Sequence, residues 1–322
     1  DSTTQERLHD LVEVQWGRDG PMPHEEFTAA LKDATAVIFG TWHYGTEAIP
    51  NAGPSLRYVF EVAGGHTHQQ LNYRACFERE IVVGGCAPAF GPAVAEMALA
   101  LSLAAARLVA EGDAAFRSGE ELWLHDGNVG AVTFFDKTVG FVGAGNLSRH
   151  LQRLLQPFGV RFLAYDPWLS EHSLNERFIE SVDLPALFAQ SDLVYVLAQA
   201  TPDNYQLVSR ELMDLLEPHD ILTVISRAHL VDFEAMADLV LEGRFRLAID
   251  VFPAEPFDAH HRIRQAEGAV FSAHRAGAIP DALLEIGRMV VDDLTALLAG
   301  REPQRMQYAT PELIRRIGVS RS

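Results

Sequence analysis

The segment that most restricts the fold of this chain is KTVGFVGAGNLSRHLQRLLQPFGVRFLAYDPW, residues 137–168. A continuous apolar run, Val139–Gly143, predicts a buried strand, and the segment Arg149–Pro157 predicts a helix. A second apolar run, Arg161–Tyr165, predicts the next strand. Two strands joined through a helix are parallel, so the sequence predicts a βαβ unit whose sheet is covered by helices.

The turn between the first strand and the helix contains two glycines, Gly143 and Gly145. Gly143 allows a sharp turn, and Gly145 leaves room for a pyrophosphate beside the amides of a helix N-terminus. Asp166 ends the second strand, where a carboxylate accepts hydrogen bonds from ribose hydroxyls and repels a 2′-phosphate. These features predict a site for NAD rather than NADP, although Ser148 stands where the fingerprint has a third glycine. A glycine-rich turn in another α/β fold, or a methyltransferase, is the alternative.

Further strands are expected on both sides of this unit, with helices between most of them, and this pattern is typical of parallel sheets with crossover helices. The expected strands are Val12–Gln15, Ala36–Phe39, Arg57–Glu61, Ile81–Val83, Asp192–Leu197, Asp220–Ile225, Arg246–Val251 and Ala269–Ser272. Helices are expected at Glu25–Lys32, from Ala93 to about Glu111, and at Asp281–Leu298. The chain opens inside what should be the first βα unit, so we expect a further strand upstream of residue 1.

Composition restricts the partners of this chain. Its formal net charge of −18 argues against nucleic acid and anionic membranes as partners, because phosphate binding needs a basic face. The two cysteines, Cys76 and Cys86, predict free thiols in a reducing compartment. His66 and His68 have no third ligand at metal spacing, so no metal is expected. The N-terminus has no signal-peptide pattern, and a cytoplasmic protein that does not enter the membrane is predicted.

Three chemically active residues follow predicted strands near the C-terminal end of the second series. They are Arg227 in TVISRAHLVD, Glu255 in AIDVFPAEP and His274 in FSAHRAG. A guanidinium can hold a carboxylate and polarise a ketone, and an imidazole can pass a proton in either direction near neutral pH. A carboxylate can orient that imidazole. Since parallel strands bring their carboxyl ends to one edge, we expect the three residues to converge beside the nicotinamide.

Two long segments and one short motif resemble a known family. They are TPDNYQLVSRELMDLLEPHDILTVISRAHLVDFEAMADLVLEGRFRLAIDVFPAEP, PSLRYVFEVAGGHTHQQLNYRACFEREIVVGGCAPAFGPAVAEMALAL and SAHRAG. Together they resemble the D-isomer-specific 2-hydroxyacid dehydrogenases, which include phosphoglycerate, hydroxypyruvate and D-lactate dehydrogenases. The resemblance implies an α/β protein with a Rossmann-type, doubly wound parallel sheet. It also implies a smaller flavodoxin-like α/β substrate domain built from both chain ends.

The resemblance gives expected domains, residue roles and partners. It implies a substrate domain of residues 1–92 and 279–322, an NAD-binding domain of residues 93–278, and a homodimer formed through the long helix at Ala93. Arg227, Glu255 and His274 would be catalytic. The cofactor would contact Gly143, Gly145, Asn146, Leu147, Asp166, Ile225, Ser226, Arg227, Asp250, His274 and Ala276. The substrate, a small 2-oxo or 2-hydroxy acid, would contact Gly64, Gly65, His66, Trp42 and Arg227.

The chain departs from the family pattern at three places, and alternatives stay open. Ser148 replaces the third glycine, Ala228-His229 replaces a glycine pair, and the loop Thr41–Tyr44 is aromatic. The aromatic loop is compatible with a bulky acid in the substrate pocket, with surface aromatics or with subunit contacts. An NAD(H)-sensing, corepressor-like regulator and a phosphonate- or phosphite-type dehydrogenase on the same fold are the rival functions. Glu255 argues against a formate-type enzyme.

Overall fold

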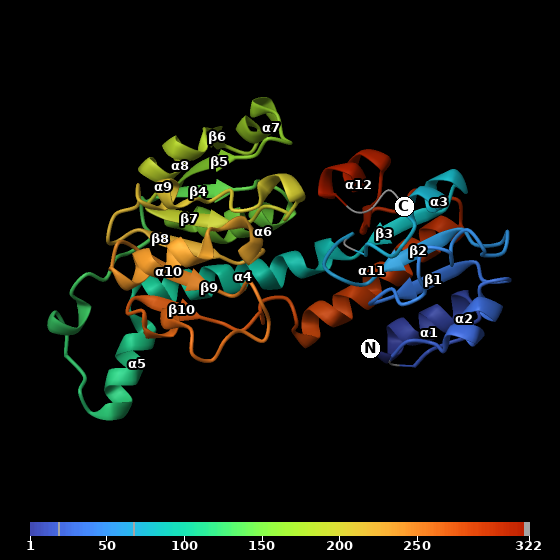
Figure 1. Ribbon diagram of the computed structural model, residues 1–322, viewed down its shortest axis with the longest axis horizontal. Helices are drawn as coiled ribbons and strands as arrows, with labels where there is room; N and C mark the ends of the chain where they lie inside the picture. The colour runs from blue at the N-terminus through green and yellow to red at the C-terminus, as the bar shows by residue number, and fades with distance from the viewer. Residues whose placement is uncertain (19, 67, 319–322) are drawn as a thin grey trace. The chain divides into compact units, whose positions relative to one another are not determined.

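The computed structural model describes residues 1–318 apart from residues 19 and 67 (Figure 1). The chain forms two compact units. Unit 1 comprises Asp1–Phe90 and Ile279–Ser322, and unit 2 comprises Gly91–Ala278. Both ends of the chain therefore contribute to unit 1, and the first junction falls after residue 90 rather than after residue 92.

Unit 2 is built on a parallel sheet of seven strands. In spatial order they are β10 (Ala269–Phe271), β9 (Arg246–Ile249), β8 (Ile221–Val224), β7 (Leu193–Val196), β4 (Thr138–Val142), β5 (Arg161–Tyr165) and β6 (Ile179–Ser181). The strand order reverses between β4 and β7, so the sheet is doubly wound, as the sequence predicted. Ligands of such sheets bind outside the carboxyl ends of the strands at this switch point.

Alternating strand residues of unit 2 face two different hydrophobic cores, which is the geometry of a sheet covered on both sides. One core joins Val142, Val194 and Val224 to the helices α8 (Leu184–Gln190), α9 (Arg210–Met213) and α10 (Phe233–Leu241). The other core joins Phe141 and Tyr195 to α4 (Ala87–Ala106) and α6 (Asn146–Leu155). The short helix α7 (Glu171–Asn175) lies beside β6.

The long apolar helix differs from its predicted limits. The helix α4 begins at Ala87, contains Pro92, and ends at Ala106, where Leu108 adopts a positive φ of 53° before α5 (Val109–Ser118) begins. The prediction of one helix to about Glu111 was wrong, because the left-handed backbone at Leu108 breaks it. By length and composition α4 could cross a membrane, but half of its apolar window is buried inside the protein.

Unit 1 has a smaller sheet. Its strands are β1 (Ala36–Phe39), β2 (Tyr58–Glu61) and β3 (Val82–Gly85), which are parallel, and β11 (Gln307–Tyr308), which runs antiparallel beside β3. One core packs α2 (His24–Ala30), α3 (Tyr73–Glu78) and α12 (Pro311–Ile317) on this sheet. The other packs α1 (Ser2–Leu11) and α11 (Pro280–Leu298).

Five short 3-10 turns, all in unit 2, complete the described chain: Asp126–Asn128, Gln156–Phe158, Pro202–Asn204, Ala228–Leu230 and Arg262–Gln265.

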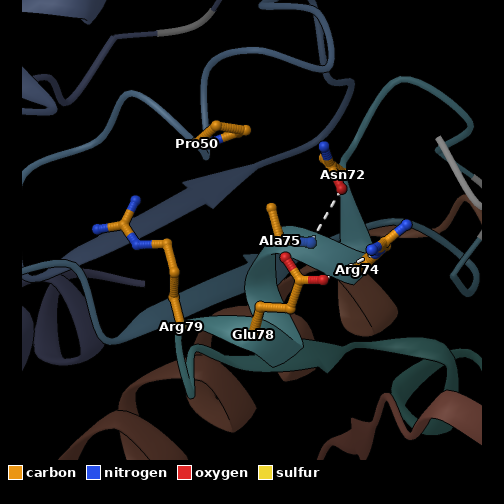
Figure 2. Close-up of a pocket in the computed structure, with 6 residues that line it drawn as sticks. All are labelled: Pro50, Asn72, Arg74, Ala75, Glu78 and Arg79. Carbon is orange, nitrogen blue, oxygen red and sulfur yellow. Dashed lines mark hydrogen bonds and ion pairs between the residues drawn. The ribbon is translucent and has the colours of Figure 1, made fainter.

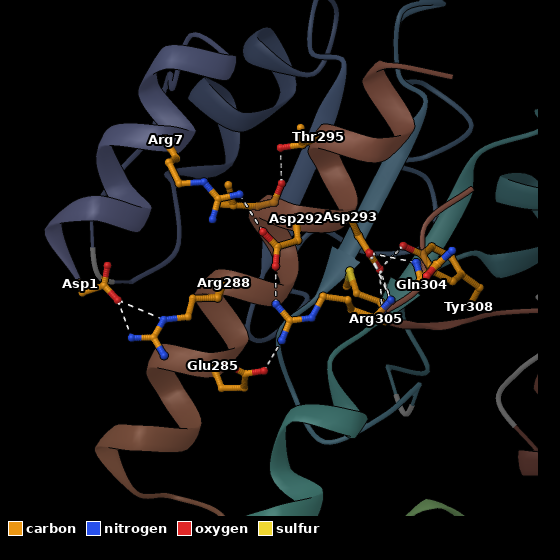
Figure 3. A network of polar contacts seen from close by, with 12 residues as sticks. Asp1, Arg7, Glu285, Arg288, Asp292, Asp293, Thr295, Gln304, Arg305 and Tyr308 are labelled. Atoms are coloured by element: carbon orange, nitrogen blue, oxygen red, sulfur yellow. Dashed lines mark hydrogen bonds and ion pairs between the residues drawn. The ribbon is translucent and has the colours of Figure 1, made fainter. Parts of the chain in front are cut away.

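The return of the chain to β11 is fixed by one buried carboxylate (Figure 3). Asp293 of α11 is 2% exposed and accepts hydrogen bonds from the amides of Gln304, Arg305 and Met306 and from the hydroxyl of Tyr308. A buried carboxylate needs such donors to offset its lost hydration. The strand β11, the helix α1 and the strand β6 were not predicted, and the strand expected at Val12–Gln15 is irregular.

Candidate active site

The glycine-rich turn lies after β4, at the switch point of the unit 2 sheet. Gly143 has a φ of +94°, and a Cβ placed on it would lie 2.6 Å from the Cα of Ala198. The positive φ and the close approach of Ala198 therefore both require glycine at position 143. Gly145 meets no atom within 4 Å of such a Cβ, so the space in front of it is open. Gly145 also caps α6, whose first residues are Asn146 and Leu147.

Ser148, the departure from the glycine fingerprint, is fully buried and hydrogen bonded. Its hydroxyl donates to the carbonyl of Gly145 at 2.8 Å and accepts from Nη2 of Arg177 at 3.0 Å. Arg177 also donates to the carbonyl of Ala144 at 2.5 Å. The serine is thus part of a network that braces the turn from within the protein, and it leaves the open space at Gly145 free.

Asp166 follows the last residue of β5 and lies beside this turn. Its two carboxylate oxygens accept hydrogen bonds from the amides of Ala144 and Trp168, each at 2.8 Å. The carboxylate keeps further lone pairs for hydroxyl donors, because each oxygen has more than one. An open glycine, a helix N-terminus and an adjacent carboxylate fit the pyrophosphate and ribose of a nicotinamide dinucleotide.

The predicted cofactor residues after β8 differ in exposure. Ile225 is 3% exposed, and the hydroxyl of Ser226 donates to the carbonyl of Val196 at the end of β7. Arg227 is exposed, and its Nη1 donates to the carbonyl of Ser226 at 2.7 Å. One guanidinium nitrogen is thereby held by the backbone, while the residue as a whole remains exposed.

Glu255 and His274 form a hydrogen-bonded pair. The imidazole Nδ1 lies 2.6 Å from a carboxylate oxygen of Glu255, and the two side chains are 43% and 37% exposed. Burial alone would raise the pKa of Glu255, but hydrogen bonds from His274 and the Phe252 amide, with the charges of His274 and Arg227, lower the pKa overall. The structure therefore joins Glu255 to His274 by a hydrogen bond, and Arg227 lies near enough for its charge to lower the pKa of Glu255.

Asp250 organises the backbone that carries His274. It is fully buried, and its carboxylate accepts from the amides of Arg275 and Ala276. The amide of His274 donates to the carbonyl of Asp250 at 2.7 Å, and His274 has a φ of +51°. A positive φ in a non-glycine residue is strained and is held by its surroundings. The side chain of Asp250 thus holds the turn of residues 274–276, and Ala276 is itself buried.

The predicted substrate residues of unit 1 follow the carboxyl ends of β1 and β2. Gly64 is exposed, and Gly65 has a φ of +145°, a conformation that favours glycine. His66 is 3% exposed. Trp42 is 4% exposed, packs against Phe27 and Phe39, and donates from its indole nitrogen to the carbonyl of Gly45.

The aromatic loop is therefore built into the core of unit 1 through Trp42. Tyr44 stacks on Phe27 with ring centroids 3.5 Å apart, while Thr41 and His43 are exposed. The structure gives the Trp42 indole a packing role in the core of unit 1, so surface exposure, one of the alternatives for this loop, is wrong for Trp42.

A hollow in unit 1 lies at α3, and none of the residues that line it is one predicted for chemistry (Figure 2). Its cations are already bonded. Arg74 pairs with Glu78 at 2.8 Å, and Arg79 donates to the carbonyls of Ile49 and Gly53. The hollow thus offers no unpaired cation to an anionic ligand.

Sequence reasoning missed two groups near the predicted sites. Arg177 braces the glycine turn from a loop distant in sequence, and no spacing rule identifies it. Glu61 ends β2 as a charge in an otherwise apolar strand, is fully buried, and contacts His66 and Tyr73. A charged residue inside a buried strand was the signal available in the sequence.

Comparison with known proteins gives one family. Residues 99–276 match the model of the D-isomer specific 2-hydroxyacid dehydrogenase, NAD binding domain. A D-3-phosphoglycerate dehydrogenase of Mycobacterium tuberculosis is 30% identical over 294 residues, which cover 91% of this chain and 54% of that protein. A glyoxylate reductase of Pyrococcus horikoshii is 28% identical over 305 residues, covering 92% and 90% of the two chains.

The solved structures agree. A phosphoglycerate oxidoreductase from Rhizobium etli has a TM-score of 0.81 and 29% identity, covering 96% of this chain and 94% of that one. The chain spans about half the length of the phosphoglycerate dehydrogenases that it matches, at 54%.

Proposed function

The chain belongs to the D-isomer specific 2-hydroxyacid dehydrogenase family, and from that premise we propose that it interconverts a 2-oxo acid and a D-2-hydroxy acid with NAD. The observation that carries the proposal is the hydrogen-bonded pair of His274 and Glu255 with the charge of Arg227 acting on it. These three groups follow neighbouring parallel strands at the ligand-binding edge of the sheet.

The bound dinucleotide supplies or accepts the hydride. Arg227 binds the substrate carboxylate and polarises the ketone, because its planar fork matches two oxygens and stays charged. His274 gives a proton to the ketone oxygen during reduction and takes it back during oxidation. Its Nδ1 is held by Glu255, so Nε2 is the nitrogen that faces the substrate.

We assign the cofactor to the turn and strand ends that fit it. The amides after Gly145 take the pyrophosphate, and the carboxylate of Asp166 takes the adenosine ribose. The resemblance adds Ile225, Ser226, Asp250 and Ala276 near the nicotinamide, of which Asp250 acts by holding the turn of His274. In unit 1, the backbone of Gly64 and Gly65 is assigned to the substrate carboxylate on the same ground, and His66 and Trp42 are assigned to the substrate side with them.

We infer a homodimer from an exposed apolar arm in unit 2. The helix α5 has no buried residue, and large apolar side chains continue along the connector that follows it. The large apolar side chains of this segment are exposed by 55–85%. They belong to Val109, Phe116, Leu122, Trp123, Leu124, Val129 and Phe135. A run of exposed apolar side chains along one segment favours association with a second copy, which the resemblance also implies through α4. Light scattering should give a dimer, and Trp123→Glu with Leu124→Glu should give a monomer.

The activity is tested by NADH oxidation with glyoxylate, pyruvate, hydroxypyruvate, phenylpyruvate and phosphonopyruvate. We expect turnover with at least one acid and NADH preferred over NADPH, because Asp166 repels a 2′-phosphate. Tight NADH binding without turnover on any acid would instead support the regulator. Turnover confined to phosphonopyruvate would support the phosphonate-type enzyme. A cytoplasmic location stays a prediction.

A further inference from the structure

Unit 1 contains a buried histidine–carboxylate pair that the proposed chemistry does not use. His66 and Glu61 lie in contact, with side chains only 1% and 0% exposed. Glu61 ends β2, His66 lies in the loop after it, and the hydroxyl of Tyr73 at the start of α3 donates to the other oxygen of Glu61. A buried charge is stable only when it is paired and hydrogen bonded.

The partners of His66 fix how many protons the pair holds. Its Nδ1 faces the carboxylate of Glu61, and its Nε2 lies 3.0 Å from the backbone carbonyl of Gln307 in β11. Both partners are acceptors, whereas a neutral imidazole donates from only one nitrogen. Either His66 carries two protons, or Glu61 is protonated and donates to Nδ1.

The surroundings of Glu61 favour the ionised carboxylate. Burial, followed by the charge of Glu61 and the hydrogen bond to it, raises the pKa of Tyr73, so the phenol remains a donor. One carboxylate oxygen then receives the proton of Tyr73 and the other faces His66. Donors on both oxygens favour the charged form of a carboxylate. The second proton therefore belongs to His66.

Other titratable groups lie near the pair. They are Cys76 and Arg79 on or after α3, Cys86 after β3, His68 in the same loop, His43 in the loop after β1, and Asp293 on α11. Burial raises the pKa of both thiols to about 12, so they stay neutral. Burial is also the main cause of the lowered pKa of His68. Asp293 is held by its own donors, so Glu61 and His66 are left to neutralise each other.

The ring of His66 is also clamped in place. It lies on the backbone of β3, where a Cβ on Gly85 would come within 3.0 Å of its Cε1. It thereby joins the end of β2, the glycine of β3 and the returning strand β11. The residue directly before it is Gly65, whose positive φ sets the direction of the loop backbone. Fixing the ring of His66 fixes the Gly64–Gly65 backbone.

We propose that His66, held as an imidazolium by Glu61 and Gln307, is a positioning residue that fixes the Gly64–Gly65 backbone for the carboxylate of the oxo acid. The role rests on the proposed function, which assigns that backbone to the substrate. Loss of the second proton would leave Nε2 and the Gln307 carbonyl as two facing acceptors and would leave a net negative charge in unit 1. Substrate affinity should therefore fall as pH rises through this step.

The first test uses NMR to measure which ring nitrogens of His66 carry a proton. The full chain is labelled with 15N-histidine, and the signal of His66 is identified by its loss in His66→Gln. We expect both ring nitrogens of His66 to be protonated at about pH 7 and only one in Glu61→Gln, whose amide keeps every hydrogen bond without the ion pair. A neutral His66 in the unaltered protein overturns the proposal, whatever the enzyme does.

The second test measures binding of oxamate, a non-reacting oxo-acid mimic, by calorimetry with NADH present. Between about pH 7 and about pH 9.5 the unaltered protein should lose about tenfold more affinity than Glu61→Gln, the size of one charged hydrogen bond. His274 and Glu255 are unchanged in both proteins, so any contribution from that pair is the same in both measurements. Equal losses overturn the positioning role. If neither protein binds oxamate, the proposed function is contradicted instead. In that case the 15N signals of His66 still show whether the ion pair with Glu61 exists.

Discussion

The histidine–carboxylate pairs His274–Glu255 and His66–Glu61 are alike in chemistry and opposite in exposure. His274 and Glu255 follow strands of the unit 2 sheet and are 43% and 37% exposed, whereas His66 and Glu61 in unit 1 are 1% and 0% exposed. A catalytic proton must leave and return, which requires contact with substrate or solvent. A buried pair holds its proton and fixes its neighbours. Exposure therefore separates the pair suited to chemistry from the pair suited to holding a loop.

The largest effect should follow from removing the exposed imidazole. His274→Ala should lower kcat by about 10²–10⁴-fold, because the proton donor to the ketone oxygen is lost. NADH affinity, measured by fluorescence titration, should change by less than about threefold, since the glycine turn is untouched. Equal losses of kcat and NADH affinity would assign His274 to cofactor binding instead.

The same chemical change in both pairs should sharpen the contrast. Glu255→Gln should lower kcat by about 10–100-fold, because the amide no longer stabilises a protonated imidazole. Glu61→Gln should change kcat by less than about threefold near pH 7, since its hydrogen bonds to His66 and Tyr73 can be kept. Steady-state kinetics on one oxo acid compare the two. A larger loss in Glu61→Gln would reverse the assignment of roles.

Arg227→Lys should raise the KM for the oxo acid by about 10–100-fold, because an ammonium cannot bind a carboxylate through two parallel hydrogen bonds. KM for NADH should stay within about threefold. The charge also favours the ionised form of Glu255. The lysine variant keeps the positive charge and loses only the planar fork. Arg227→Met loses both, so the two variants together separate the effect of the fork from the effect of the charge.

The two glycines of the turn form a matched pair. Gly145→Val places a side chain in open space, so the free energy of unfolding should hold while NADH affinity falls by about tenfold or more. Gly143→Ala forces a Cβ against Ala198 at a φ of +94°, so it should cost about 1–3 kcal/mol of stability. Denaturant unfolding and NADH titration measure both. A strongly destabilised Gly145→Val would show that its space is not open.

The smallest effect concerns a carboxylate with no histidine partner. Asp220 precedes β8, and burial is the main cause that raises its pKa to about 6. Its unfolded pKa is about 3.9, so between about pH 4 and pH 6 the folded state binds more protons and stability falls as pH rises. Asp220→Asn should remove that slope and add about 1–2 kcal/mol near pH 7, less than the full shift implies because Asp220 is partly exposed and screened by solvent. Denaturant unfolding across pH measures both changes. An unchanged slope would assign it to other groups.

Several parts of the fold could be predicted from local sequence alone. The strand at Ala36–Phe39 and the strand at Arg161–Tyr165 were predicted at their observed limits, because apolar runs bounded by turn residues carry that information. The doubly wound order followed from strands alternating with helices. The edge strands β6 and β11 were missed, since Ile179–Ser181 and Gln307–Tyr308 are too short and polar to show a period.

The sequence by itself determined the glycine turn, the acid after β5 and the order of Arg227, Glu255 and His274, because strand ends in a parallel sheet meet at one edge. Only the tertiary structure decided that Trp42 is buried in the core of unit 1, that Arg177 donates a hydrogen bond to Ser148, and that Glu61 contacts His66. These contacts join residues through burial and side-chain direction, which depend on how layers pack and not on spacing along the chain.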